Sequence, residues 1–310
     1  MASAAPADHH GETRRRSGLT SVIIVAADSG AGLLEAVGHV LASTVDVEAI
    51  VVDNASSDGS VDAAAARWTG DARVRIVRNP NNLGFGAGCN RGAAAANGDA
   101  LLFLNPDCLV APDVVARLRA AATDGIGLLG VAIVDGAGSA EPASRRRDPT
   151  LRRTLMTLSG LAHWQSRWPA LAGVDLAPAR PAAPLEDVDA VSGALMFMPR
   201  SVFDAVGGFD EGYFLHAEDL DLCRRVRDAG YRVACANTIE VAHAKGGSSR
   251  HRPLFVSWHK HRGLWRWFTK FDPAARNPLL RGVVWAGLWV RFALLAPVAA
   301  LRQQFASRQR

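Results

Sequence analysis

Short apolar runs of strand length, separated by stretches of helical composition, are the feature that most constrains this chain. The runs are Ser21–Ala27, Glu48–Asp53, Arg73–Val77 and Ala100–Leu104, and helical stretches reach about Ser43 after the first run and cover Gly86–Asn97 and Pro112–Thr123. Strands that lack a polar face are typical of a parallel sheet with helices on both sides. The alternation therefore predicts βαβ units and a doubly wound, mostly parallel α/β sheet.

Composition excludes several classes of protein. Mean hydropathy is +0.05, too low for a polytopic membrane protein. The 49% of hydrophobic and 21% of charged residues are close to globular averages, which argues against a disordered or fibrous chain. The four cysteines form no Cys-x-x-Cys pair, as expected of a reducing compartment rather than a zinc ribbon or disulfide scaffold. Residues 1–18 lack the apolar core of a secretory signal, and we expect a disordered leader there.

Polar residues stand at the ends of two of these runs. Asp53 ends the second run, and Asn105-Pro106-Asp107 follows the fourth. Ligands of open α/β sheets bind outside the carboxyl ends of the strands, so these residues are expected to share a crevice. The simpler interpretations are a helix cap over Asp53–Ser60 and an ordinary turn at Asn-Pro-Asp. Within one crevice, Asp53 can instead accept a hydrogen bond from a uracil-like imide, and Asp107 becomes a candidate ligand of Mg²⁺ or Mn²⁺.

A turn rich in glycine and asparagine, Asn79–Gly92, leads into the helix after the third run. Its glycines are spaced as GxGxG rather than GxGxxG, and they follow the third strand instead of the first. Both facts disfavour a dinucleotide-binding dehydrogenase. A glycine turn at a helix N-terminus can still hold a diphosphate.

The most informative stretch is acidic, Glu218–Arg225 (EDLDLCRR). Three carboxylates within four residues repel one another, and the simpler interpretation is a first helical turn that complements the helix dipole. The preceding Gly207–Leu215 is aromatic and glycine-rich, as expected of a shaped pocket. The two arginines that end the stretch are spaced to pair with Asp221, which would leave Asp219 free to face the crevice as a base.

Further along the chain the pattern is less regular. Residues 136–187 are rich in Pro, Arg and Ala without a strong period, and we expect a variable insertion on the acceptor side. Strand-like runs return at Val188–Met198 and Tyr231–Ala236, with a helix from about Glu218 to Ala229 between them. His243 ends another such run. A lone histidine is usually structural, but one at a strand end before a glycine-rich loop can ligate a metal or contact a phosphate.

Taken in order, these blocks resemble the inverting glycosyltransferase family 2 with the GT-A fold, and most of all its rhamnosyltransferase-like branch. The matching blocks lie within residues 20–245 and are Ser21–Val25, Val51–Ser60, Asn79–Gly92, Leu104–Asp107, Val191–Pro199, Val206–Arg225 and Val241–His243. The resemblance implies transfer of a sugar from a dTDP- or UDP-sugar to a hydroxyl of a lipid-linked or polysaccharide acceptor. The expected sugar is L-rhamnose from dTDP-rhamnose, in bacterial cell-surface glycan synthesis.

The resemblance also implies a role for each matched residue. Asp219 would be the catalytic base of a single in-line displacement, and Glu218 would lie beside the acceptor or orient that base. Asp107 and His243 would hold Mg²⁺ or Mn²⁺, while Asn105 replaces the first acid of the family's DxD motif and leaves the site one charge short. The residues expected to bind the donor are Asp53, Asn54, Asp58, Asn82, Gly84, Asn90, Asn105, Ser192 and Gly193.

The C-terminal segment carries most of the positive charge. Residues 245–310 contain 13 Lys and Arg and one acidic residue, a net charge of +12. Residues 1–244 contain 22 Lys and Arg and 29 Asp and Glu, a net charge of −7. Basic and aromatic residues alternate over 245–281, a pattern that favours either nucleic acid or a membrane interface. The extension, residues 246–310, is therefore expected to meet a phosphate-rich partner.

The apolar helix expected over 279–305 decides between these partners. Arg281, Arg291 and Arg302 fall within an arc of about 80° on it, a stripe typical of a helix that lies in a membrane interface. Arg291 at the centre of a bilayer would cost about 2.5–3.5 kcal/mol, which disfavours a spanning helix. We therefore expect monotopic attachment to the anionic cytoplasmic face of a bacterial inner membrane, and no nucleic acid. A buried core or oligomer helix is the alternative.

Two other functions remain open at this point. A sugar nucleotidyltransferase would need a basic, glycine-rich loop after the first strand, and Ala26–Gly32 has glycines but no basic residue. A non-catalytic membrane-binding protein on a decayed fold conflicts with the retained Asp53, Asp107 and Asp219, although Asn105 leaves room for it. Donor selectivity is expected to depend on the surroundings of Ser192–Leu195 and Trp164–Trp168.

Overall fold

The computed structural model describes residues 15–123, 125–135, 138–139, 141–176, 183–243 and 253–307. The strands are β1 (Arg16–Ala26), β2 (Val47–Asp53), β3 (Val74–Arg78), β4 (Gly98–Leu104), β5 (Cys108–Leu109), β6 (Ile126–Val134), β7 (Arg145–Arg146), β8 (Leu185–Asp187), β9 (Ala190–Val191), β10 (Leu195–Pro199) and β11 (Arg232–His243). The α-helices are α1 (Gly32–Leu41), α2 (Ser60–Arg67), α3 (Phe85–Ala95), α4 (Val114–Ala121), α5 (Leu151–Leu158), α6 (Arg200–Ala205), α7 (Glu218–Asp228), α8 (Pro253–Phe271) and α9 (Pro278–Ser307). Short 3-10 turns are η1 (Pro142–Ser144), η2 (Leu161–Trp164), η3 (Pro169–Leu171) and η4 (Pro273–Arg276).

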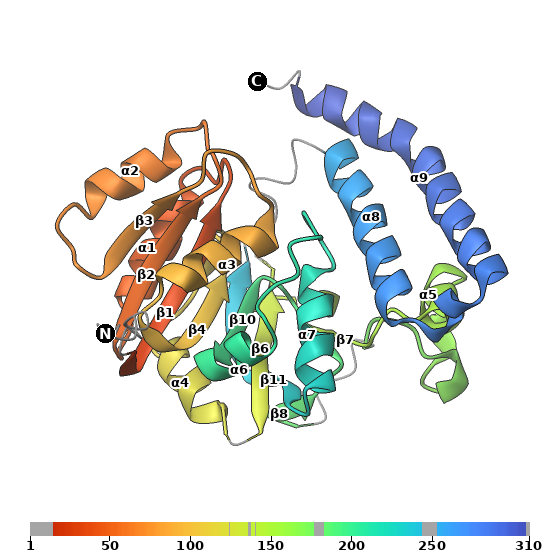
Figure 1. Ribbon diagram of the computed structural model, residues 1–310, viewed down its shortest axis with the longest axis horizontal. Helices are drawn as coiled ribbons and strands as arrows, with labels where there is room; N and C mark the ends of the chain where they lie inside the picture. Colours follow the sequence, from red (N-terminus) through yellow and green to blue (C-terminus); the bar gives the residue numbers. More distant parts are fainter. Residues whose placement is uncertain are drawn as a thin grey trace, which may run out of the picture.

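A nine-stranded sheet forms the centre of the molecule, with strands in the order β3-β2-β1-β4-β10-β6-β11-β5 and with β8 paired to β11 (Figure 1). The first four strands are parallel as predicted, and β6 and β11 are parallel to each other. β10 runs antiparallel to both β4 and β6, and β5 and β8 run antiparallel to β11. The chain enters β10 at the carboxyl end of β4, where Leu195 pairs with Leu104, so this strand runs back and the sheet becomes mixed.

Because β10 reverses between two strands of the same direction, the carboxyl ends of β1, β2, β3, β4, β6 and β11 share one edge of the sheet. Asp53, the Asn105–Asp107 turn and His243 all lie at that edge. The predicted convergence of strand ends therefore follows from the observed topology.

Helices cover both faces of the sheet, which is why its strands have no polar face. Val22 and Ile24 pack with α1, α2 and α4 on one face, whereas Ile23 and Val25 pack with α3, α6 and α7 on the other. Alternate side chains of a strand thus enter two different hydrophobic clusters. This arrangement puts α3 and α7 on the same face.

Three predicted elements differ from the observed ones. β1 begins at Arg16, so residues 16–18 belong to the sheet rather than to the predicted leader, whose residues 1–14 lie outside the described residues. The single run expected over Val188–Met198 is two strands, β9 and β10, because Ser192–Ala194 turns between two sheets. The central strand β6 was not predicted, although its sequence IGLLGVAIV is as apolar as the runs that were.

The C-terminal extension forms a hairpin of α8 and α9 at the end of the molecule opposite β3 and α2 (Figure 1). α8 joins the core, because Trp267 is 1% exposed and packs in the same cluster as α7. α9 packs along α8 and has the length and composition of a membrane-spanning helix over Pro278–Pro297. Its exposed apolar side chains include Leu279, Val283 and Leu294, at spacings that place them on one face.

Two cations of the predicted stripe of α9 contact α8. The Arg281 guanidinium lies 5.8 Å from the ring centroid of Trp265, and the Arg291 Nη1 is 3.0 Å from the Nε2 of His261. The Arg302 side chain lies outside the described part of the chain. These two cations therefore contact α8 within the chain, and the expectation that the stripe meets the membrane stays a prediction.

Candidate active site

Asp219 lies in the first turn of α7, with only 9% of its surface exposed. Its Oδ1 accepts a hydrogen bond from the backbone N–H of Leu220 (2.8 Å), and its Oδ2 accepts one from the backbone N–H of Gly193 (3.1 Å). The same Oδ2 accepts a hydrogen bond from the guanidinium of Arg146. Arg225 pairs with Asp221 as predicted, but Arg224 pairs with Asp148 and Asp228 instead. Asp219 is not left unpaired, because Arg146 forms an ion pair with it.

Arg146 is a residue of this candidate site that the sequence analysis missed. It comes from the two-residue strand β7, and its guanidinium also donates to the backbone carbonyl of Val191 (2.6 Å). Burial disfavours the charged form of Asp219, but the charge and hydrogen bond of Arg146 keep the pKa of this carboxyl below its ordinary value. The only sequence signal was a run of three arginines, Arg145–Arg147, in a segment without periodicity.

Glu218 has a different environment from its neighbour. Its side chain lies against α3, since a Cβ added to Gly86 would be 3.7 Å from the Glu218 Cβ. Burial, followed by the negative charge of Asp219, raises the pKa of Glu218 to about 8. Its Oε2 is shielded from solvent and has no hydrogen-bond partner among the described residues. Adjacent carboxyls therefore differ in charge near neutral pH: Asp219 is ionised, and Glu218 is largely protonated.

The backbone before these acids is strained. His216 and Ala217 have φ values of 67° and 71°, in a left-handed region that costs roughly 1–2 kcal/mol for each residue with a side chain. Two close approaches restrain this turn. A Cβ on Gly263 of α8 would lie 2.5 Å from the His216 carbonyl oxygen, and the Phe85 N–H donates to the Phe214 carbonyl (3.0 Å). The C-terminal hairpin thus helps to set the position of the base.

A candidate metal site lies at the ends of β4 and β11. The Asp107 Oδ1 is 3.2 Å from the His243 Nε2, and the His243 Nδ1 is 3.2 Å from the Glu141 Oε1. A carboxylate on the second nitrogen is what orients a metal-binding imidazole, so Asp107 and His243 fit a divalent cation such as Mn²⁺. Cys108 lies in the same cluster. Burial raises the pKa of its side chain well above the ordinary value, which favours the protonated thiol over the thiolate that binds metals.

Two adjacent backbone groups connect Asp219 to the candidate metal site. Gly193 donates to Asp219, and the carbonyl of the next residue, Ala194, accepts from the Asn105 N–H (2.9 Å). The Ser192 Oγ accepts from the Ala194 N–H (3.2 Å) and stabilises this turn. The structure therefore brings Asp219 into the neighbourhood of the Asn105–Asp107 turn and of His243.

The expected base-reading residue, Asp53, is buried at the end of β2, and its carboxylate has partners within the chain. Its Oδ1 accepts from the Ser56 N–H (2.8 Å), and its Oδ2 accepts from the Arg78 guanidinium (3.1 Å). Asp58 accepts from the Gly30 N–H (2.8 Å), which joins the loops after β1 and β2. These acids shape the loops at the carboxyl edge.

The asparagines of the expected donor site also hold loops together. The Asn54 Nδ2 donates to the Gly84 carbonyl (2.9 Å), and the Asn82 Oδ1 accepts from the Gly84 N–H (2.9 Å). Asn90 donates to the Phe209 carbonyl (2.9 Å) and accepts from the Phe209 N–H (2.8 Å), which fixes the loop before α7. Contacts with a donor from these residues stay predictions.

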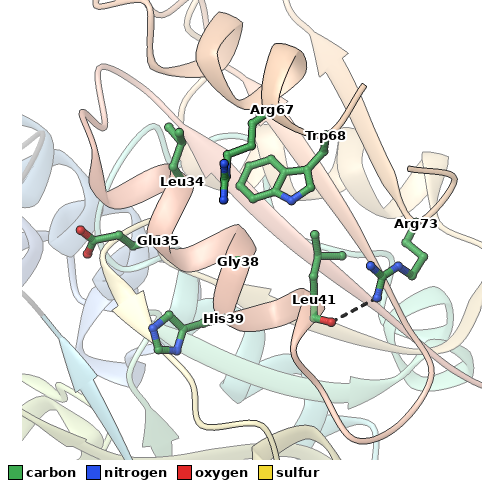
Figure 2. Close-up of a pocket in the computed structure, with 8 residues that line it drawn as sticks. All are labelled: Leu34, Glu35, Gly38, His39, Leu41, Arg67, Trp68 and Arg73. Carbon is green, nitrogen blue, oxygen red and sulfur yellow. Dashed lines mark hydrogen bonds between the residues drawn. The ribbon is translucent and has the colours of Figure 1, made fainter. Parts of the chain in front are cut away.

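A separate open pocket of about 570 Å³ lies by α1, on the other face of the sheet from α7 (Figure 2). Its lining residues are Leu34, Glu35, Gly38, His39, Leu41, Arg67, Trp68 and Arg73. Arg73 is held there by the Leu41 carbonyl (3.1 Å) and by Asp71, and the Arg67 guanidinium lies 5.9 Å from the Trp68 ring centroid. The pocket contains none of the expected site residues.

Comparison with known proteins decides the family. Residues 21–175 match Glycosyl transferase family 2, and residues 172–259 match Glycosyl transferase family 21. The N-acetylglucosaminyl-diphospho-decaprenol L-rhamnosyltransferase of Mycobacterium tuberculosis is 31% identical over 269 residues, which cover 77% of this chain and 85% of that protein. The chain belongs to glycosyltransferase family 2. The predicted enzyme class, a glycosyltransferase, is confirmed.

Solved structures agree on the fold of the glycosyltransferase. A mannosyltransferase from Pyrobaculum calidifontis, in complex with GDP-Man and Mn²⁺, aligns with a TM-score of 0.56 at 18% identity and covers 98% of this chain and 79% of its own. GalNAc-T7, with UDP, GalNAc and Mn²⁺, aligns with a TM-score of 0.54 at 18% identity over 73% of this chain and 43% of its own. The predicted GT-A fold is confirmed.

Proposed function

We propose that this glycosyltransferase moves L-rhamnose from dTDP-rhamnose to a hydroxyl of a lipid-linked glycan, with inversion at the anomeric carbon. The observation that carries the proposal is Asp219, an ionised carboxylate fixed at one oxygen by both Gly193 and Arg146, beside the turn that bears Asp107. The name of the mycobacterial relative supports both the sugar and a diphosphate-lipid acceptor. The role in bacterial surface glycan synthesis rests on the same support.

In the proposed mechanism, Asp219 accepts the proton of an acceptor hydroxyl as that oxygen bonds to the anomeric carbon of the donor sugar. The bond from this carbon to the nucleoside diphosphate breaks on the opposite face, and inversion follows. Arg146 orients the carboxylate and keeps it charged before the reaction. A carboxylate with a low pKa can accept this proton only when the attacking oxygen has begun to bond to carbon, because the hydroxyl then becomes more acidic. The fixed position of the Asp219 carboxylate is therefore its main contribution.

Asp107 and His243 would hold Mn²⁺ or Mg²⁺, with Glu141 orienting the imidazole. When bound, the cation supplies positive charge close to the diphosphate of the donor. Asn105 adds no charge, so the protein ligands leave more of the cation's charge uncompensated than a pair of acids would. The residues that we propose around the donor are Asp53, Asn54, Asp58, Asn82, Gly84, Asn90, Asn105, Ser192 and Gly193.

We also propose that α9 attaches the enzyme to the cytoplasmic face of the membrane, where a lipid-linked acceptor is presented. The exposed apolar face of α9 and the positive charge of the C-terminal segment support this attachment. Monotopic attachment predicts release by alkaline carbonate or high salt. Resistance to both, with a need for detergent, would instead favour a spanning helix.

The proposed reaction is tested with the full-length protein, dTDP-rhamnose, Mn²⁺ and a synthetic N-acetylglucosaminyl-diphospho-lipid, with mass spectrometry of the product. We expect addition of one deoxyhexose by the native enzyme and loss of turnover by orders of magnitude in Asp219→Asn, with donor binding retained. A thermal-shift panel of dTDP-, UDP- and GDP-sugars checks the donor, because a ligand of the native state raises its stability. Near-normal turnover by Asp219→Asn, or transfer from a different sugar nucleotide alone, would refute the proposal.

A further inference from the structure

Two cations of the C-terminal hairpin lack carboxylate partners within the described residues. Lys260 of α8 is only partly exposed to solvent and forms no hydrogen bond or ion pair there. Arg291 of α9 contacts His261, whose Nδ1 is 2.7 Å from the Ser257 carbonyl. Burial, and then the charges of Arg291 and Lys260, lower the pKa of His261. The ring is therefore a neutral acceptor that fixes Arg291 without neutralising it.

The other end of α8 is different. Lys270 contacts Asp210 (2.7 Å) and Asp221 (2.6 Å), and Arg266 contacts Asp210 (2.8 Å). The cations nearer the end of α8 are thus matched by acids of the 207–217 loop and of α7. Within the described residues, Lys260 and Arg291 make no such contact with a carboxylate, so the two ends of α8 differ.

Lys260 lies close to the turn that leads into Asp219, and the next residue, His261, contacts Arg291. Lys260 precedes by one helical turn Gly263, which packs against the His216 carbonyl, two residues before Glu218. Burial lowers the pKa of Lys260, and the positive charges of Arg291 and Arg146 lower it further. The same Lys260 and Arg146 charges act on His216. We call Lys260, Arg291 and Arg146 the hairpin cation cluster. Arg146 pairs with Asp219, Lys260 lies one helical turn from the contact with His216, and Arg291 contacts the residue that follows Lys260.

The hairpin cation cluster carries more positive than negative charge. Asp219 is paired with Arg146, and Asp175 is the other acid that acts on Arg146 and Lys260. Glu218 is largely protonated near neutral pH. Like charges this close repel, and a bound anion would remove the repulsion. Two buried nitrogens at the same place, the Nε of Arg146 and the Nε2 of His216, have no partner among the described residues.

We propose that the hairpin cation cluster binds the diphosphate of the lipid-linked acceptor, an inference that rests on the proposed function. On one side, Gly193 and Ala194 connect Asp219 to the turn that bears Asp107, where the donor diphosphate is proposed. On the other side, Arg146 connects Asp219 to the hairpin cation cluster. The base thus has a separate diphosphate position on each side. When one sugar links the acceptor hydroxyl to its diphosphate, that hydroxyl reaches the base while the lipid extends along the exposed apolar face of α9.

The test compares two acceptors with the full-length enzyme: N-acetylglucosamine on a short-chain prenyl diphosphate, and the same sugar on a neutral alkyl chain of similar length. For Lys260→Gln and Arg291→Gln we expect the KM of the diphosphate acceptor to rise about tenfold or more. The KM of the neutral acceptor and of dTDP-rhamnose should not change. Arg262→Gln is the matched control, since Arg262 is an exposed cation 200° around α8 from Lys260.

Equal changes for both acceptors, or a changed KM for the donor, would overturn the proposal, as would no change at all. Inorganic pyrophosphate and phosphatidylglycerol vesicles serve as competitors. Loss of vesicle binding in Lys260→Gln with an unchanged acceptor KM would make the cluster a general membrane contact and contradict the inference. Direct calorimetric binding of the prenyl-diphosphate sugar needs no turnover. A native enzyme that binds it through Lys260 but transfers no rhamnose would refute the proposed reaction while supporting this binding site.

Discussion

The guanidinium of Arg146 donates a hydrogen bond to the carboxylate of Asp219 and joins β7, a strand of two residues, to the first turn of α7. The pair buries most of both side chains, which are 16% and 12% exposed. An arginine at this place fixes the direction of the carboxylate and keeps it ionised. It also connects Asp219 to the segment 136–187, which the sequence marks only by its irregular composition.

Replacing Arg146 with Gln should lower kcat and shift the acid limb of the pH profile of kcat/KM. Without the guanidinium, the largest of the interactions that oppose the effect of burial is lost, and the pKa of Asp219 rises. The acid limb should therefore move to higher pH. A purely structural role would reduce activity equally at all pH values, and this result would contradict the electrostatic role of Arg146. Arg147→Gln, one residue along the chain, is the control.

Replacing Glu218 with Gln should stabilise the protein in alkaline but not in acidic solution. The folded pKa of about 8 lies above the ordinary 4.5, so between these values only the unfolded state loses its proton. Native Glu218 therefore costs stability as pH rises from 4.5 to 8, and Gln removes that cost. We expect a higher Tm for the variant at pH 8, by the equivalent of ~1 kcal/mol or more, and equal Tm values at pH 4.5. Glu35→Gln, on the exposed face of α1, is the control.

His216 should make the native protein sensitive to mild acid. Burial, and then the positive charge of Lys260, lowers the pKa of His216 from the ordinary 6.5 to about 4. The charges of Arg146 and His259 also lower this pKa, whereas the negative charge of Asp219 raises it. The unfolded state therefore binds a proton first, and stability falls as pH decreases from 6.5 to 4. The loss is on the order of 3 kcal/mol.

Asn is the informative replacement at position 216, because it tolerates a positive φ. Thermal unfolding of His216→Asn and of the native chain at pH 7 and pH 4.5 checks the prediction. The native Tm should fall more between these pH values than that of the variant. Parallel decreases in both proteins would assign the acid sensitivity to other groups.

The exposed face of α9 should determine membrane attachment without contributing to the chemistry. Val283 and Leu294 are 67% and 72% exposed on the same face. The double replacement Val283→Asp, Leu294→Asp should move the protein from the membrane to the soluble fraction on flotation with phosphatidylglycerol vesicles. Activity toward a short-chain soluble acceptor should be retained. Continued flotation of the variant would mean that another surface holds the membrane.

The amino-acid sequence determined the first half of the sheet and most of the carboxyl-edge residues, for local reasons. Continuous apolar runs can only be strands buried on both faces, and the polar residues that end them, Asp53 and Asp107, then fall at one edge by topology. The i, i+4 pair of Asp221 and Arg225 was equally local and formed as predicted. Each of these features depends on residues near in sequence or on one repeating period.

Tertiary structure decided what surrounds the base. Arg146 reaches Asp219 across 73 residues, and Arg291 of the predicted stripe contacts His261, 30 residues away. A long cationic side chain takes whichever acceptor packing brings within reach, and no sequence period encodes that choice. Whether a carboxylate is an ionised base or a protonated core group, as Asp219 and Glu218 differ, depends on the burial and charge that only the folded chain assembles.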